Sequence, residues 1–441
     1  MSTPRCVGAL VLLFAIACWA QSTPPGQPAL ELSLAKAIEI ATSSQGNTTV
    51  QMAQETEQLS FSRYTEARAR LLPNLDGSVA EQNQIVNPRA LGLRFESPTF
   101  TVPEEVGPFY TFDARLRLNQ NLLNLSTIRH WQATHEDVQA AKSETQSVRE
   151  RVAGTVTRLY AAVLRADAEV EAAKANIAGA EALRDLASHR ASVGEGTDLE
   201  VTRAKLKVAR DRQRMLAAET ERTRTQLDLI KVLNVDWSAT LHLTGRLEST
   251  HTETSTVAES VAMALKSRAD FKVQENRTES ARLNHSAAKL ERMPSIVGYA
   301  DYGVLGGVQT HTIGAALRVP LFDGGRLESD RLQTVSLMHQ EQIRQKELRS
   351  QVELEVRQAL AALESTEQQV QVAEQAMVLA EEELARARRR YEAGVTNSLE
   401  VIDAQTQLEI TRDDHVAALF NYTNARIDLA QATGTITKMV F

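Results

Sequence analysis

Apolar residues recur along two stretches of the chain with alternating spacings of four and three. In the first stretch they are Val152, Val156, Leu159, Val163, Ala166, Val170, Ala173, Ile177 and Ala180. In the second, with one threonine among them, they are Val352, Val356, Ala359, Leu363, Thr366, Val370, Ala373, Met377 and Ala380. Such spacing over several heptads is typical of coiled-coil packing with a left-handed twist. It predicts helices at about 127–191 and 327–392, each roughly 100 Å long at 1.5 Å per residue.

A repeated sequence motif lies at the end of each of these long helices. Residues 193–204 read VGEGTDLEVTRA, and residues 393–404 read AGVTNSLEVIDA. In each motif the glycine, Gly194 or Gly394, is expected to end the long helix. The next helix is expected to be capped by Thr197 or Asp198 in the first motif, and by Asn397 or Ser398 in the second. The motifs therefore predict the tips of two helical hairpins, whose second helices run at about 198–234 and 398–433.

Most of the chain is written twice at an offset of 200 residues. We interpret 21–247 and 248–441 as two copies of one unit, a tandem duplication. Upstream the offset grows to 221, because the first copy has a longer, proline-containing loop between Pro73 and Leu118. No proline occurs between Pro108 and Pro294 or after Pro320. Since proline breaks helices, these stretches permit very long ones.

Between the helical stretches the period changes to two. Apolar and polar residues alternate along 112–118, and apolar residues occupy every second position along 313–319, which predicts strands at about 109–122 and 310–321 with one apolar and one polar face. Partner strands are expected at about 74–80 and 295–303, giving two hairpins and four strands per chain.

The first twenty residues resemble an export signal. Arg5 precedes an apolar run, Val7–Trp19, that is too short to span a bilayer but suits a signal peptide cleaved after Ala20. Lipidation of Cys18 is an alternative, since Ala15-Ile16-Ala17 precedes it. Both cysteines, Cys6 and Cys18, lie here, so a mature chain from Gln21 has no thiol. Downstream, no run of 18 apolar residues occurs, so the exported chain is expected either to be soluble or to enter a membrane as strands.

Four strands are too few to close a barrel, for which about eight is the practical minimum. Three chains that share their strands would form a barrel of twelve around a polar bore. Asp113, Arg115, Arg117 and Arg318 would then face that bore. The alternative is a soluble pair of hairpins packed on helices.

The sequence resembles the TolC-like outer-membrane efflux proteins over almost all of its mature length. The resemblance rests on the duplication, on the strand entries after Pro73 and Pro294, and on three motifs. The motifs are Pro320-Leu321-Phe322-Asp323-Gly324-Gly325, Arg390-Tyr391-Glu392-Ala393-Gly394 and Leu399-Glu400-Val401-Ile402-Asp403-Ala404-Gln405. It implies a mostly α fold with a small β part: a homotrimer with a 12-stranded transmembrane β-barrel and a long α-barrel crossing the periplasm.

The resemblance also implies partners and a gate. The hairpin tips would contact a periplasmic adaptor protein, through Val193, Gly194, Gly196, Thr197, Gly394, Val395, Thr396 and Asn397. An inner-membrane pump of the RND, ABC or MFS type would load the duct, and outer-membrane lipid would surround the barrel. Family gates carry acidic residues just past the tip, which places Glu200, Glu400 and Asp403 there, with Tyr391 beside them. Arg203 stands where the first copy would repeat Asp403, so this ring is expected to be less acidic.

Other chemistry finds little support in the sequence. The nine histidines are scattered singly, and no nucleophile motif, phosphate-binding loop or metal-ligand spacing occurs. We predict no enzyme activity, cofactor or metal. The net charge of −7 is spread along the chain without a basic block, which argues against nucleic-acid binding.

The leading hypothesis is an outer-membrane exit duct of a tripartite efflux or type I secretion system. A periplasmic adaptor is the first alternative, although adaptors usually have one hairpin and lipoyl-like segments. A coiled-coil protein without a pore is the second, and it leaves the alternating strands unexplained. The sequence does not indicate the cargo or the class of pump.

Overall fold

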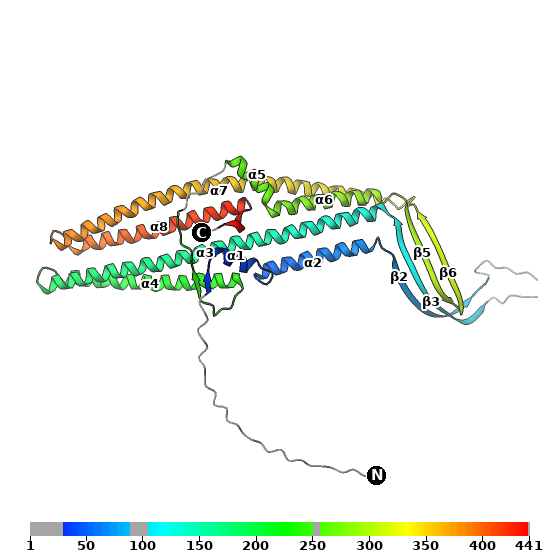
Figure 1. Ribbon diagram of the computed structural model, residues 1–441, viewed down its shortest axis with the longest axis horizontal. Helices are drawn as coiled ribbons and strands as arrows, with labels where there is room; N and C mark the ends of the chain where they lie inside the picture. Colours follow the sequence, from blue (N-terminus) through cyan, green and yellow to red (C-terminus); the bar gives the residue numbers. More distant parts are fainter. Residues whose placement is uncertain (1–29, 89–104, 250–255, 440–441) are drawn as a thin grey trace, which may run out of the picture.

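The structure is a computed structural model that describes residues 30–88, 105–249 and 256–439 (Figure 1). A long bundle of helices carries a four-stranded sheet at one end and two hairpin tips at the other. The predicted signal peptide, including Cys18, lies outside the described residues, as does most of the proline-containing loop.

Four long helices build the two hairpins. They are α3 (Leu125–Ser192), α4 (Asp198–Leu233), α7 (Arg326–Glu392) and α8 (Ser398–Ala432). Each begins and ends within two residues of the predicted bounds. The helix α3 packs on α4, α7 packs on α8, and α3 also lies against α8, which joins the hairpins. Every residue of both heptad patterns is buried or half-buried, so the spacing of four and three marks the packed seam.

Shorter elements, which the sequence analysis did not predict, fill the middle of the molecule. They are α1 (Leu34–Thr42), α2 (Thr48–Ala69), α5 (Val257–Ser267), α6 (Ala269–Leu290) and the 3₁₀ helix η1 (Ile436–Lys438). Figure 1 shows α2 and α6 continuing toward the sheet from where α4 and α8 end. In α2 only Val50 and Ala67 are buried, so no apolar stripe marks this helix in the sequence.

The sheet has the order β2-β3-β5-β6 and is antiparallel throughout. Its strands are β2 (Asn74–Val86), β3 (Val106–Leu123), β5 (Ser295–Leu305) and β6 (Val308–Arg318). The strands β2, β3 and β5 are longer than predicted. The expected end of β6 at residue 321 is wrong: the strand stops at Arg318, just before Val319-Pro320, because proline offers no N–H to a ladder. Gly306 and Gly307, both with positive φ, make the tight turn from β5 to β6.

A second, small pairing lies at mid-length. The strands β1 (Leu30–Leu32) and β4 (Leu241–Leu243) are parallel and join the two ends of the first repeat. The largest apolar cluster surrounds them and includes Leu32, Val156, Tyr160 and Leu229, all fully buried. A separate cluster near the tips contains residues of all four long helices.

Within the described residues, no helix is both long and apolar enough to cross a membrane.

Candidate functional site

The first tip is closed by hydrogen bonds around a glycine. Gly194 has φ +78°, a conformation that glycine adopts without strain. The next two amides, of Glu195 and Gly196, donate to the carbonyl of Arg190 over 2.9 and 3.1 Å. Thr197 then caps α4 in a capping box with Glu200, and the Glu200 carboxylate accepts from the Thr197 amide over 3.2 Å. The tip therefore orients Glu200 through the start of its own helix.

The second tip has the same backbone but different side-chain contacts. Gly394 has φ +72°, and Asn397 caps α8 by accepting from the Leu399 amide over 3.0 Å. Glu400 pairs with Arg390 over 3.2 Å and accepts from the Thr396 hydroxyl over 2.5 Å. Of the two cap residues that the sequence allowed at each tip, the structure has Thr197 and Asn397, while Glu400 takes a different partner from Glu200.

The two tips also contact each other. The second carboxylate oxygen of Glu200 accepts from the amide of Ser398, in the first turn of α8, over 3.2 Å. From the other side, Arg190 donates to the carbonyl of Tyr391 and lies 4.7 Å from the centre of its ring. Glu200 is therefore a bridge between the hairpins as well as a helix cap. A pattern read along one repeat does not show this contact.

Tyr391 lies inside this contact and is 1% exposed. Its hydroxyl has no hydrogen-bond partner among the described residues. Burial raises the pKa of the Tyr391 phenol, the Glu200 charge adds to that rise, and Arg190 opposes it. The ring packs in the apolar cluster near the tips with Leu384, Val401 and Leu408. The structure thus places Tyr391 as interhelical packing, with the phenol neutral at physiological pH.

The remaining predicted tip residues lie at the surface. Asp403 and Arg203 are exposed, and Asp403 forms no ion pair with any described residue. Val193, Leu199, Val395 and Leu399 are each between 44% and 69% exposed. Exposed apolar side chains gathered at one end of a charged bundle are typical of a protein-binding surface.

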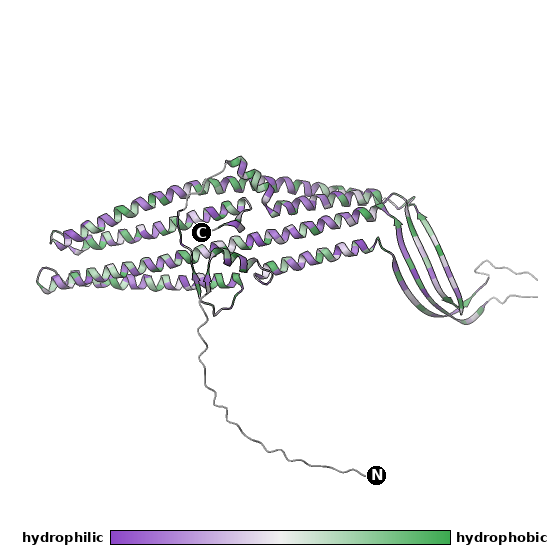
Figure 2. Ribbon diagram, viewed as in Figure 1, coloured by the Kyte–Doolittle hydropathy of each residue, from purple (hydrophilic) through white to green (hydrophobic). Residues whose placement is uncertain are grey.

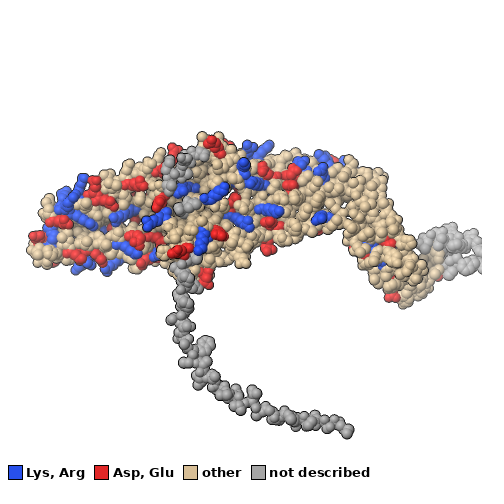
Figure 3. All heavy atoms as spheres, in the orientation of Figure 1, with Lys and Arg blue, Asp and Glu red and all other residues tan. Residues whose placement is uncertain are grey.

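At the opposite end, the sheet has two chemically different faces. Register places Asp113, Arg115, Arg117 and Arg318 on one face. There Arg115 pairs with Asp113 over 2.5 Å, and Arg117 with Asp301 on the neighbouring strand over 2.9 Å. The other face carries exposed apolar side chains, among them Leu75, Val79, Leu116, Ile313 and Leu317. Figure 2 shows the resulting alternation along the strands, and in Figure 3 charged side chains spread over the helices but are sparse on the sheet.

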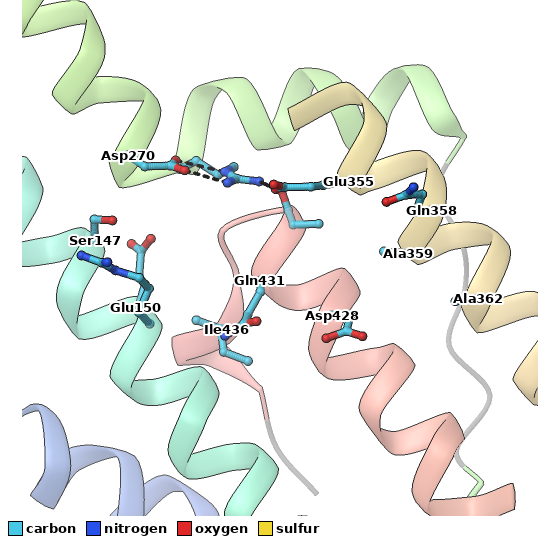
Figure 4. A pocket seen from close by; sticks show the side chains of 13 residues that line it. Ser147, Glu150, Asp270, Glu355, Gln358, Ala359, Ala362, Asp428, Gln431 and Ile436 are labelled. Atoms are coloured by element: carbon cyan, nitrogen blue, oxygen red, sulfur yellow. Dashed lines mark hydrogen bonds and ion pairs between the residues drawn. The ribbon is translucent and has the colours of Figure 1, made fainter. Parts of the chain in front are cut away.

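A cavity of about 500 Å³ lies at mid-length, where α8 ends and α6 begins. Asp270 and Glu355 approach the Arg268 guanidinium from opposite sides (Figure 4). Burial acts to lower the pKa of Arg268, but the two carboxylates outweigh it and raise that pKa above its usual value. Burial also raises the pKa of Glu150 on the facing helix. Arg268, Asp270 and Glu355 pair with one another in this cavity, and no group of three or more His, Cys, Asp or Glu side chains in the described part of the chain is placed to hold a metal ion.

The chain resembles known proteins in sequence and in structure. Residues 40–235 and 261–435 match the sequence profile of the family described as "Outer membrane efflux protein". The pyoverdine export outer membrane protein OpmQ of Pseudomonas putida is 23% identical over 315 residues. That alignment covers 67% of this chain and 64% of OpmQ, so it spans less than two thirds of the relative's length.

Solved structures share the fold. The outer membrane protein VceC of Vibrio cholerae superposes with a TM-score of 0.76 and 21% identity, covering 91% of this chain and 96% of VceC. A membrane protein from Pseudomonas aeruginosa has a TM-score of 0.79 and 18% identity, covering 92% of this chain and 91% of its own. Together with the two profile matches, which span well over half of the sequence, these likenesses show that the chain belongs to the outer membrane efflux protein family.

Proposed function

We propose that three copies of this chain form a passive exit duct in the bacterial outer membrane, extending into the periplasm. The observation that carries the proposal is the four-stranded sheet with one polar and one apolar face, whose strands β2 and β6 each have one edge without a partner strand among the described residues. Unpaired strand edges are costly in lipid, and an exposed apolar face is costly in water. Twelve strands from three chains would pair every edge, turn the apolar face toward lipid and enclose the polar face.

The polar face would then line the barrel. The bases Arg115, Arg117 and Arg318 on that face are matched in number by the acids Asp76, Asp113 and Asp301. Because these charges balance, the barrel lumen is expected to select weakly between anions and cations. The helices would continue the duct through the periplasm, since α3 with 68 residues is roughly 100 Å long.

The tips would form the entrance and the docking surface for an adaptor protein. Support comes from the exposed apolar residues Val193, Leu199, Val395 and Leu399 at the two turns. Glu200 and Glu400 are already committed to contacts within the chain, so Asp403 is the predicted gate carboxylate that is free to face its copies in a trimer. Three copies of one exposed acid at a constriction repel one another, and adaptor docking would supply the contacts that stabilise an open entrance.

The partners follow from this arrangement: an adaptor at the tips, an inner-membrane pump behind it, and outer-membrane lipid around the barrel. OpmQ is described as a pyoverdine exporter, and a tube with balanced charges takes its cargo from whichever pump loads it. An adaptor or a pore-free coiled coil is the alternative function, but neither needs an amphipathic sheet with open edges.

Reconstitution in planar lipid bilayers tests the proposal. The mature protein, purified in detergent from the outer-membrane fraction, is expected to give discrete single-channel steps with weak ion selectivity. Recovery of the protein only in the soluble periplasmic fraction, with no conductance after addition to bilayers, would overturn it.

A further inference from the structure

A buried group of charges lies between the two hairpins, away from the tips. On α4, Lys207, Asp211 and Arg214 follow one another at helical spacing on one face, and Glu409 of α8 meets them. Lys207 Nζ lies 2.7 and 2.9 Å from the two carboxylate oxygens of Asp211. It also donates to Glu409, whose other oxygen accepts from Arg214 over 2.5 Å. We refer to these four residues as the latch.

Burial makes the latch unusual for this molecule. Lys207, Asp211 and Glu409 are 7%, 2% and 3% exposed, whereas most ion pairs here lie at the surface. A buried charge is tolerated only when it is paired, and removing one partner strands the other. Surface pairs such as that of Arg224 with Glu221 contribute little in comparison.

The latch joins two helices that have few other contacts with each other, although α8 also packs on α3. The helices α4 and α8 belong to different repeats and approach each other only over a short stretch. Lys207 lies nine residues into α4, roughly 14 Å above the tip at 1.5 Å per residue. Asp211 is on the same helix as Lys207, so their ion pair does not connect the two hairpins. Glu409 is on α8 and pairs with two cations of α4, so Glu409 is the residue that connects them.

Buried ion pairs do little for net stability compared with apolar residues, but they specify how helices are paired and aligned. We propose that Glu409, seated between Lys207 and Arg214, is a positioning residue that holds the two hairpins of one subunit together above the gate. The closed entrance then depends on this latch in addition to the tip contacts of Glu200. The inference rests on the proposed channel function for its consequence, but its structural part is independent of it.

Two nearly isosteric substitutions distinguish the loss of a contact between the helices from the loss of a buried charge. Glu409→Gln removes the carboxylate that crosses between the helices, while Asp211→Asn removes an equally buried carboxylate and leaves the crossing intact. In planar bilayers, E409Q is expected to raise the time-averaged conductance of the closed channel several-fold, and D211N by less than about twofold. Amide hydrogen exchange of residues 401–412 is expected to be about tenfold faster in E409Q and little changed in D211N.

Arg214→Met provides a variant with less risk to folding, because the Arg214 side chain is 59% exposed. It is expected to give an intermediate effect in both measurements, and Arg224→Met, the matched surface control on α4, none. Equal effects of E409Q and D211N, or no effect of E409Q and R214M, would overturn the latch. If the unmodified protein never conducts, the channel proposal fails, and the exchange comparison still decides whether Glu409 joins the hairpins.

Discussion

At mid-length each repeat joins the end of one helix to the start of another, and the two repeats make this junction with different contacts. In the first repeat α4 ends where α2 begins, and two amides join the ends: Asn47 donates to the Val232 carbonyl over 3.0 Å, and Asn234 to that of Gly46 over 3.1 Å. The largest apolar cluster surrounds this junction. In the second repeat α8 ends where α6 begins, and Arg268 donates to Asp270, Glu355 and the Ala432 carbonyl beside a cavity.

The two copies therefore share a fold but stabilise it with different side-chain contacts. The first junction depends on burial of apolar surface, so its stability is expected to be insensitive to salt. The second depends on partly exposed charges, which salt screens. The tips differ in the same sense, since Glu200 links both hairpins while Glu400 pairs with Arg390 at the surface. Substitutions at the two junctions and at the two tips test this contrast.

Tyr160→Ala tests the apolar junction. Tyr160 is fully buried, donates to the Leu32 carbonyl over 3.0 Å and accepts from the Gly245 amide over 3.1 Å. Loss of a buried aromatic ring is expected to lower the local free energy of unfolding by about 3–5 kcal/mol, measured by hydrogen exchange around β1 and β4. Tyr160→Phe keeps the ring and serves as the control, with a loss of about 1–2 kcal/mol. A loss below 1 kcal/mol in Y160A would contradict the central place of this cluster.

Arg268→Met tests the charged junction. Removing the guanidinium leaves Asp270 and Glu355 facing each other without a cation. Because their side chains are about one-third exposed, the expected loss is about 2–3 kcal/mol, less than for a fully buried pair. Hydrogen exchange at the start of α6 measures it. Adding Glu355→Met to R268M removes one stranded charge and is expected to recover part of the loss; no recovery would count against a charge-based junction.

Glu200→Gln and Glu400→Gln compare the tips. E200Q weakens acceptance from the Thr197 and Ser398 amides and is expected to cost about 1 kcal/mol. E400Q removes a surface pair and is expected to cost less than about 0.5 kcal/mol. Exchange rates of the Thr197 and Ser398 amides report both. Equal costs at the two tips would show that the cross-tip contact contributes nothing beyond ordinary capping.

Tyr391→Phe is expected to cause no loss of stability. The hydroxyl is buried without a partner among the described residues, so its removal is expected to leave stability unchanged or raise it by up to about 1 kcal/mol. The folded-state pKa is raised, so the unfolded chain loses its proton first and stability falls as pH rises above about 10. Y391F is expected to lack that part of the alkaline loss. A clear destabilisation near neutral pH would mean that the hydroxyl has a partner in the assembled protein.

The sequence predicted the long helices and the hairpin tips closely because their signals are redundant. Nine heptad positions in each repeat agree on one seam, and a glycine with a following cap marks each turn. The helix α2 was missed because only two of its residues are buried, and α6 because its buried face includes the polar residues Gln274, Ser280 and His285. The strands β1 and β4 were missed because three residues carry too little pattern.

The sequence indicated which residues lie at the tips but not which contacts they make. Glu200 lies close to Tyr391, whereas Glu400 contacts Arg390 and Thr396 of its own tip. The Glu200–Ser398 and Arg190–Tyr391 contacts depend on how two hairpins about 200 residues apart pack on each other. The only sign of Lys207 and Glu409 in the sequence is that they are charged residues on helix faces that are otherwise packed. No local rule pairs them, because the pairing exists only after the two repeats have docked.

If one chain supplies a third of a tube, the channel exists only as a trimer. The detergent-corrected mass of the purified mature protein, measured by sedimentation equilibrium, decides this. We expect a single species of three chains that persists on dilution, because each open strand edge is paired with a neighbour. A stable, folded single chain with the same hydrogen-exchange protection in β2 and β6 would contradict it.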